Sequence, residues 1–142
     1  MSLEHEFYLI PATVDMKNFW MDRENNENII ESVMMHDDLI QYILDSLKEV
    51  PSRNPASRKV VEQYGFNYHG VTLFDHQSSN KLQSVLSAWR EVFKNNSPLM
   101  ELTIEEENLT VDRDKTIASL EKLMSMTLEL DDKKHYIYHC GI

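Results

Sequence analysis

The side chains best suited to catalysis or metal binding in this sequence are six histidines and one cysteine. His135 and His139 are four residues apart, a spacing that joins two side chains on a helix but separates them on the strand predicted there. Cys140 lies on the same apolar strand, where a cysteine usually packs as a small hydrophobe. The chain contains no H-E-x-x-H, paired C-x-x-C or EF-hand pattern. We therefore predict no metal site and no catalytic cysteine.

The remaining candidate for acid–base chemistry is the pair Asp75-His76, in a polar turn between an apolar strand and an amphipathic helix. A carboxylate next to an imidazole can orient it and tune its pKa. If the fold has a pocket, we expect it here, with Tyr68 and His69 on the preceding strand contributing to it. The alternative is a turn in which Asp75 bonds to the backbone and His76 faces water.

Glycine usage excludes two kinds of nucleotide site. The only glycines are Gly65, Gly70 and Gly141. A P-loop or a Rossmann turn needs several glycines in a fixed pattern around a helix N-terminus. We therefore expect no nucleotide site of either kind, and we predict no cofactor.

The net charge of −10 and a pI near 4.9 bear on the choice of partner. Repulsion from phosphates disfavours nucleic acids and anionic membranes, whereas a basic protein would be attracted. The candidate contact residues are the acidic groups and two aromatic anchors, Glu105, Glu106, Glu107, Asp131, Asp132, Trp20 and Tyr64. Capping of helix ends also explains acidic clusters, and packing of the Phe19-Trp20 pair in the core also explains Trp20.

Hydrophobic periodicity predicts alternating strands and helices. Strands are expected at residues 6–14, 66–74, 99–104 and 136–142, with a returning hairpin strand at 109–111. Helices are expected at 27–49, about 80–94 and about 112–130, and residues 50–58 form a loop before a short helix at 58–64. Asp37-Asp38 interrupts the first helix and leaves open a second segment that starts there. The order predicts an α+β fold, with a mixed sheet of four to five strands against about three helices.

A length of 142 residues predicts one domain, residues 1–142. The first residues carry no positive charge before their short apolar segment, which does not fit a secretory signal. A single cysteine suits a reducing compartment, so we expect a cytoplasmic protein.

Three stretches, EFYLIPA at the start, YHGVTLFD before a helix ending in AWREVF, and YIYHCGI at the end, resemble small bacterial α+β immunity proteins. Such proteins neutralise a toxin from neighbouring cells, frequently a nuclease, through a tight protein–protein interface. The resemblance implies a non-enzymatic acidic inhibitor and transfers no site residues.

Three hypotheses fit these observations. The first is a cytosolic inhibitor of a basic toxin, with acidic groups steering association and Trp20 or Tyr64 anchoring the contact. The second is a small enzyme or ligand-binding domain that uses the Asp75-His76 turn. The third is an accessory or structural protein, of phage origin, that acts by self-association, for instance as a homodimer.

Overall fold

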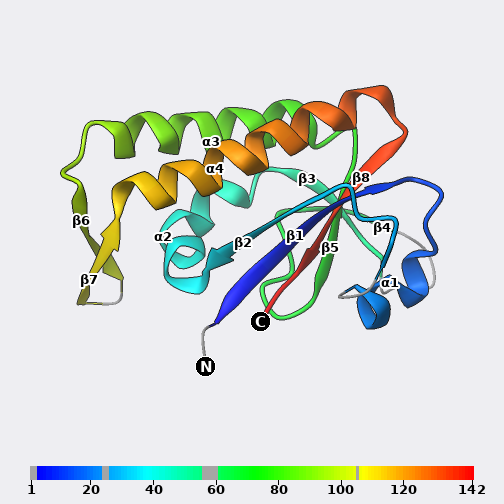
Figure 1. Cartoon of the computed structure of the whole chain (residues 1–142), viewed down its shortest axis with the longest axis horizontal. Helices are drawn as coiled ribbons and strands as arrows, with labels where there is room; N and C mark the ends of the chain where they lie inside the picture. Colours follow the sequence, from blue (N-terminus) through cyan, green and yellow to red (C-terminus); the bar gives the residue numbers. More distant parts are fainter. Residues whose placement is uncertain (1–2, 24–25, 56–60, 105) are drawn as a thin grey trace.

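A computed structural model describes residues 3–23, 26–55, 61–104 and 106–142 of the chain (Figure 1). Its strands are β1 (Glu4–Pro11), β2 (Glu31–His36), β3 (Pro51–Asn54), β4 (Val61–Tyr64), β5 (Val71–Phe74), β6 (Leu99–Ile104), β7 (Glu107–Asp112) and β8 (His135–Cys140). Its helices are α1 (Met16–Asp22), α2 (Asp37–Leu47), α3 (Ser79–Lys94) and α4 (Arg113–Leu128), followed by a 3₁₀ helix, η1 (Glu129–Asp132). Six strands form one sheet in the order β2-β1-β8-β5-β3-β4, and β6-β7 form a separate hairpin.

The first and last strands lie together in the middle of the sheet. β1 pairs with β8 in antiparallel register, with Tyr8 opposite Tyr138, and β8 pairs on its other side with β5. The four C-terminal residues of β8, 137–140, are all buried. This apolar terminal strand is therefore tied into the sheet on both sides.

The larger core lies between the sheet and the three helices α2, α3 and α4, which cover one face (Figure 1). Alternate residues of the strands point to this face because strand side chains have a period of two. The helices bury stripes at three- and four-residue steps, as in Leu82, Val85, Leu86 and Phe93 of α3. This stripe confirms the helix expected at 80–94.

The other face of the sheet carries a smaller core beneath α1. Phe19 is 1% exposed and lies between Tyr8 and Tyr138, with ring centroids 5.7 and 4.7 Å away. Ile10, Leu73 and Cys140 complete this cluster. The seven-residue helix α1 thus covers part of this face through Phe19.

The α+β class is confirmed, but the sheet differs from the expected mixed sheet of four to five strands. Every strand pair among the described residues is antiparallel. The sheet has six strands beside a two-stranded hairpin, and four α-helices accompany them.

The helix expected at 27–49 was wrong in its first part, because residues 31–36 form edge strand β2. This strand pairs with β1 from Glu4–His36 to Leu9–Glu31. Val33 and Met35 point to the core, whereas Met34 is 39% exposed. The side chains therefore alternate as in a strand, although all three residues are apolar and the sequence alone does not show this. The helix begins at Asp37, as in the alternative that a separate segment starts at Asp37-Asp38. The His36 imidazole caps it by accepting the Asp38 N–H at 3.0 Å.

The loop expected at 50–58 and the short helix at 58–64 were also wrong where the structure describes them. Residues 51–54 and 61–64 form the antiparallel pair β3-β4 at the sheet edge. Pro51 is tolerated because it is the first residue of its strand. Residues 56–60 of these two predictions lie outside the described part of the chain.

The central strand expected at 66–74 is shorter than predicted. Only residues 71–74 form β5, because the Gly70 N–H donates to the Asn67 carbonyl at 3.1 Å and closes a turn. The loop at 66–70 therefore leaves the sheet and reaches over its end. No helix in the described residues is long and apolar enough to cross a membrane.

Candidate functional site

A chain of polar side chains crosses the larger core between the sheet and α2. His5 on β1, His139 on β8 and Thr72 on β5 all have a relative exposure of 0%. Each is in phase with apolar residues of its own strand that face the helices, so the period of two turns all three to the same side. Asp37, the first residue of α2, is 3% exposed and faces them. We call these four residues, with Gln41 and Tyr68, the polar network.

The hydrogen bonds of the polar network all donate in the same direction, from Thr72 through His139 and His5 to Asp37. His5 Nε2 lies 2.9 Å from Asp37 Oδ1, and His5 Nδ1 lies 2.9 Å from His139 Nε2. A carboxylate only accepts, so His5 carries its proton on Nε2 and accepts at Nδ1 from His139 Nε2–H. His139 Nδ1 is then an acceptor for the Thr72 hydroxyl at 3.3 Å, and that hydroxyl accepts the Asn67 N–H at 2.7 Å. Both imidazoles are neutral in this arrangement.

Burial decides the direction of the pKa shifts of the two histidines, whereas hydrogen bonding decides that of Asp37. Burial and, to a smaller extent, the neighbouring His5 together lower the pKa of His139 to about 3. Burial also lowers the pKa of His5, against the opposing effect of Asp37. Burial alone would raise the pKa of Asp37, but hydrogen bonds from Tyr68, His5 and Gln41 outweigh it and hold that pKa below its usual value. The network therefore holds a single negative charge, on Asp37.

Two half-buried side chains end the polar network at the surface. The Tyr68 hydroxyl donates a short hydrogen bond to Asp37 Oδ1. Gln41 Nε2 donates to Asp37 Oδ2 at 2.6 Å and lies 3.1 Å from the Tyr68 hydroxyl oxygen. Burial and the Asp37 carboxylate raise the pKa of Tyr68 to about 12, so the phenol stays a donor at neutral pH.

All four ring nitrogens of His5 and His139 are engaged inside the polar network. Neither ring has a free lone pair for a substrate, and neither ring reaches the surface. General base catalysis needs such a lone pair within reach of the substrate. The arrangement therefore positions Tyr68 and Gln41 and does not itself provide an acid–base pair.

The C-terminus holds Tyr68 over the polar network. The Gly141 N–H donates to the Gly70 carbonyl at 2.7 Å, and the Ile142 N–H donates to the Tyr68 carbonyl at 3.1 Å. A Cβ atom on Gly141 would lie 2.2 Å from the Tyr68 carbonyl oxygen, so only glycine allows this approach.

Gly141→Ala is accordingly expected to lower the free energy of unfolding by about 1–2 kcal/mol, because the last two residues must move off the loop. Urea denaturation of the variant measures the loss. Gly70→Ala is the matched control, because its added Cβ would meet Asn67 Cβ at an ordinary 3.4 Å. An equal effect of the two substitutions would contradict this role for Gly141.

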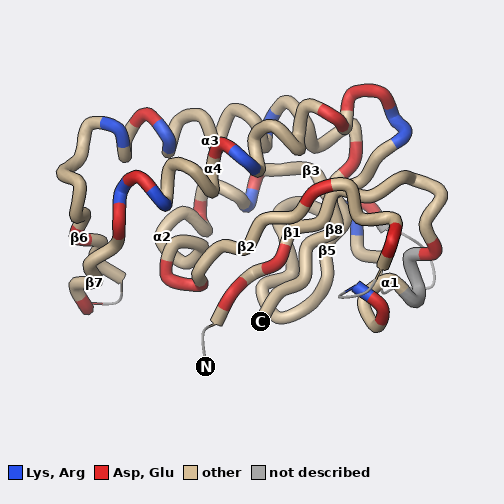
Figure 2. Tube along the Cα trace, in the orientation of Figure 1, with Lys and Arg blue, Asp and Glu red and all other residues tan. Residues whose placement is uncertain are grey.

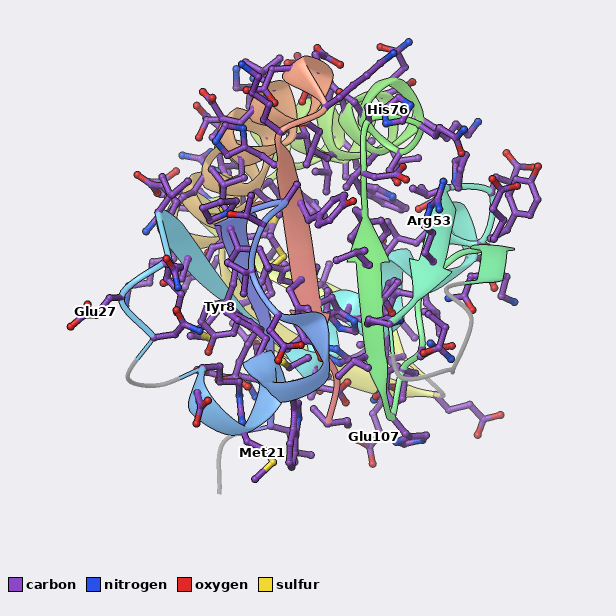
Figure 3. The ribbon with its side chains drawn as sticks, turned by 90° about the vertical axis from the view of Figure 1, so that its right-hand side faces the viewer. Tyr8, Met21, Glu27, Arg53, His76 and Glu107 are labelled. Carbon is purple, nitrogen blue, oxygen red and sulfur yellow. The ribbon has the colours of Figure 1, made fainter. Side chains whose placement is uncertain are left out.

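A second feature is the exposed side of α1, which presents Trp20 at 50% and Met21 at 74% exposure. Figure 3 shows Met21 extending from α1 away from the sheet. Arg23 lies over the Trp20 ring, with Cζ 5.2 Å from its centroid, and donates to the Trp20 carbonyl at 2.7 Å. Arg23 Nε also donates to Glu6 at 3.0 Å. We call Trp20 and Met21 the α1 surface.

The expected pocket residues are not brought together. Tyr68 and His69 precede β5, whereas Asp75 and His76 follow it, about 13 Å further along for a four-residue strand. Tyr68 belongs to the polar network, and the exposed His69 ring contacts the Tyr68 ring with centroids 4.7 Å apart. Asp75 is buried, with Oδ2 2.7 Å from Arg53 Nε and Oδ1 accepting the Gln77 N–H at 2.9 Å.

His76 is exposed and lies at the start of α3, far from α1 in Figure 3. The turn therefore has the arrangement given as the alternative, in which Asp75 bonds to the backbone and His76 faces water. An apolar cavity in the larger core has a volume of about 10 Å³, room for about one water molecule and too small for a ligand.

The expected contact residues are spread over the molecule. Glu106 lies in the turn of the β6-β7 hairpin, Glu107 begins β7, and Glu105 lies outside the described residues. Asp131 and Asp132 lie in η1, at the far end of α4, and this 16-residue helix separates the two groups by about 24 Å. Figure 2 shows acidic residues at both ends of α4.

Tyr64 is 74% exposed on edge strand β4. β4 lies four strands away from β1, about 19 Å across the sheet, so it does not adjoin the strand that anchors Arg23. Trp20 and Tyr64 are therefore exposed aromatics on separate parts of the surface.

One group of described residues has the side chains for a metal ion. Ligand atoms of Glu129, Asp132 and His135 lie within 4.8 Å of one another. Asp132 already accepts the Lys134 N–H at 2.7 Å and hydrogen-bonds to His135 Nδ1. These bonds close the turn after η1 and account for the cluster without a metal ion. We assign no ion to it.

Comparisons with protein-family models, with curated proteins and with solved structures found no match for this chain. The resemblance to immunity proteins therefore stays a prediction. The site residues that sequence reasoning missed are His5, Asp37, Gln41, Thr72 and His139. The sequence signal that could have found the histidines is their position in the strand pattern. His5 lies on the same side of β1 as the buried Phe7 and Leu9, and His139 lies on the same side of β8 as the buried Ile137.

Proposed function

We propose that this protein is a non-enzymatic binding protein that inhibits a basic protein, in the manner of an immunity protein or antitoxin, and that the α1 surface anchors the partner. The observation that carries the proposal is the state of Trp20. Its ring is half exposed, yet it is held by Arg23. Tryptophan is among the residues most often found at the energetic centre of protein interfaces.

The Trp20 ring is tied to the sheet through a chain of contacts. The Tyr8 hydroxyl donates to Glu6 at 2.7 Å, the other Glu6 oxygen accepts from Arg23, and Arg23 covers Trp20. Burial and the Glu6 carboxylate raise the pKa of Tyr8, so the phenol remains a donor. A side chain held in this way has less conformational entropy to lose on binding.

Charge supports a basic partner. The net charge of −10 raises the rate of encounter with a positively charged protein, and high salt weakens this effect. Steering of this kind acts over about 10 Å at 0.1 M salt, so the acidic groups nearest the α1 surface contribute most to it.

Trp20→Ala is expected to weaken partner binding by at least about 30-fold, because loss of a hot-spot aromatic costs about 2 kcal/mol or more. The stability of the protein is expected to change by less than about 1 kcal/mol, since the ring is half exposed. The experiment compares proteins captured from the source cells by wild-type and Trp20→Ala baits, with quantification by mass spectrometry.

Val92→Ala is the matched control, because Val92 is 51% exposed on α3, on the other side of the sheet from α1. We expect a basic protein that the wild-type and Val92→Ala baits retain and the Trp20→Ala bait loses. Expression of that protein should arrest growth of cells, and co-expression of the wild-type chain should restore it. Equal capture of every protein by all three baits would contradict the proposal.

A further inference from the structure

A cleft of about 360 Å³ lies between α2 and the β6-β7 hairpin, at the end of the molecule opposite α1 (Figure 1). Its walls are Gln41, Tyr42 and Leu44 from α2 and Thr103 and Ile104 from β6. The volume falls within the range of small-molecule sites. The cleft shares no residue with the α1 surface, so a ligand site here is independent of the proposed function.

The polar network fixes the orientation of the Gln41 amide. Gln41 Nε2 lies 2.6 Å from Asp37 Oδ2, and a carboxylate at neutral pH only accepts hydrogen bonds. The amide nitrogen must therefore face Asp37, and the carbonyl oxygen must face away from it. No described residue donates a hydrogen bond to that oxygen, so a cleft-lining residue has a fixed and unused acceptor.

The other cleft residues define what could meet this acceptor. Leu44 and Ile104 are apolar, and none of the five lining residues is charged. The Thr103 hydroxyl already donates to Asn108 at 2.8 Å. A charged ligand would lose water here without gaining an ion pair from the walls, whereas a neutral ligand would not have that penalty.

We infer that this cleft binds a small uncharged molecule whose N–H group donates to the Gln41 carbonyl oxygen and whose apolar body lies against Leu44 and Ile104. Gln41 is the binding residue, and Asp37 is a positioning residue that acts through it. The chain from Thr72 through His139 and His5 to Asp37 holds this carboxylate in place.

Benzamide and acetophenone test the inference, because they have nearly the same shape and charge but only benzamide has an N–H donor. Each is titrated into the full-length ¹⁵N-labelled protein while the amide resonances of Tyr42, Leu44, Thr103 and Ile104 are followed. Benzamide is expected to give saturable shifts with a Kd in the roughly millimolar range, as befits a fragment of this size. It is expected to bind about fivefold more tightly than acetophenone, the value of one net hydrogen bond.

Gln41→Leu keeps the volume of the side chain and is expected to abolish the preference for benzamide. Asp37→Asn lets the Gln41 amide exchange the positions of its nitrogen and oxygen. It is therefore expected to reduce the ratio of benzamide affinity to acetophenone affinity, although Asp37 does not line the cleft. Gln77→Leu, at an exposed glutamine, should leave it unchanged. The wild-type comparison needs no variant, so the inference stays testable if Gln41→Leu does not fold. Absence of saturable shifts at the cleft, equal affinity for the two probes, or a preference that survives in Gln41→Leu would each overturn it.

Discussion

Asp37→Ala is expected to lower the free energy of unfolding by about 3 kcal/mol, because it removes the common acceptor of three donors. Those donors are His5 Nε2, the Tyr68 hydroxyl and Gln41 Nε2. Tyr68 and Gln41 are half-buried and can turn to water, whereas His5 has an exposure of 0% and cannot. The cost therefore comes mainly from a buried imidazole N–H without a partner.

Urea denaturation at pH 7.5 measures this loss, and Asp38→Ala is the matched control. Asp38 lies in the same first turn of α2 and carries the same charge, but its side chain is 35% exposed. We expect that control to cost less than about 1 kcal/mol, since it loses only a favourable charge near the helix N-terminus. Similar losses in the two variants would show that the polar network does not stabilise the fold.

The stability of the protein is expected to fall between pH 7.5 and pH 5, with His139 alone contributing about 2 kcal/mol of the loss. The pKa of His139 is lowered to about 3 in the folded protein by burial, whereas a histidine in the unfolded chain titrates near its ordinary value of 6.5. Below that value the unfolded chain takes up a proton that the folded protein does not, so acid favours unfolding.

His5 adds to the same loss, because burial lowers its pKa as well. Asp37 acts at lower pH. Its pKa is depressed in the folded protein, so its stabilising effect is present above the ordinary carboxyl value and is lost only as the pH falls below that value.

Urea denaturation at pH 7.5, 6.5, 5.5 and 5 tests this dependence in wild type, His139→Gln and His76→Gln. Glutamine at position 139 can replace both hydrogen bonds but does not titrate, so the loss between pH 7.5 and pH 5 should shrink by about 2 kcal/mol. His76 is exposed, and its replacement should leave the loss unchanged. An unchanged pH dependence in His139→Gln would contradict the buried neutral pair.

The hydrophobic pattern was sufficient to predict those helices and strands whose conformation depends mainly on their own residues. The stripe Leu82, Val85, Leu86 and Phe93 predicts α3, and the alternation of residues 99–104 predicts β6 with the bounds that the structure has. The helix expected from about residue 112 is α4, and the Asp112 side chain caps it by accepting the Lys115 N–H at 2.9 Å.

Local pattern failed where a partner strand decides the conformation. Residues 31–36 and 51–54 are too short to show a clear period, and each becomes a strand because a neighbouring strand supplies its hydrogen bonds. The α1 surface illustrates a different limit. Adjacent helical residues point about 100° apart, so Phe19 and Trp20 cannot both face the core. Phe19 does so, and Trp20 is left at the surface.

The polar network could not be predicted from spacing, because its members are joined by the fold. His5 and His139 are 134 residues apart in the chain, and His5 and Asp37 are 32 apart. The phase of each histidine predicts that it faces the core, and no more than that. Which partner satisfies it depends on the pairing of the first strand with the last and on the start of α2.

The most direct test of the proposed function is the affinity of the captured basic protein for wild type, Trp20→Ala and Val92→Ala, measured by calorimetry with purified components. We predict a Kd at least about 30-fold higher for Trp20→Ala than for wild type, and a Kd within about threefold of wild type for Val92→Ala. An equal Kd for Trp20→Ala and wild type would show that the α1 surface does not hold the partner.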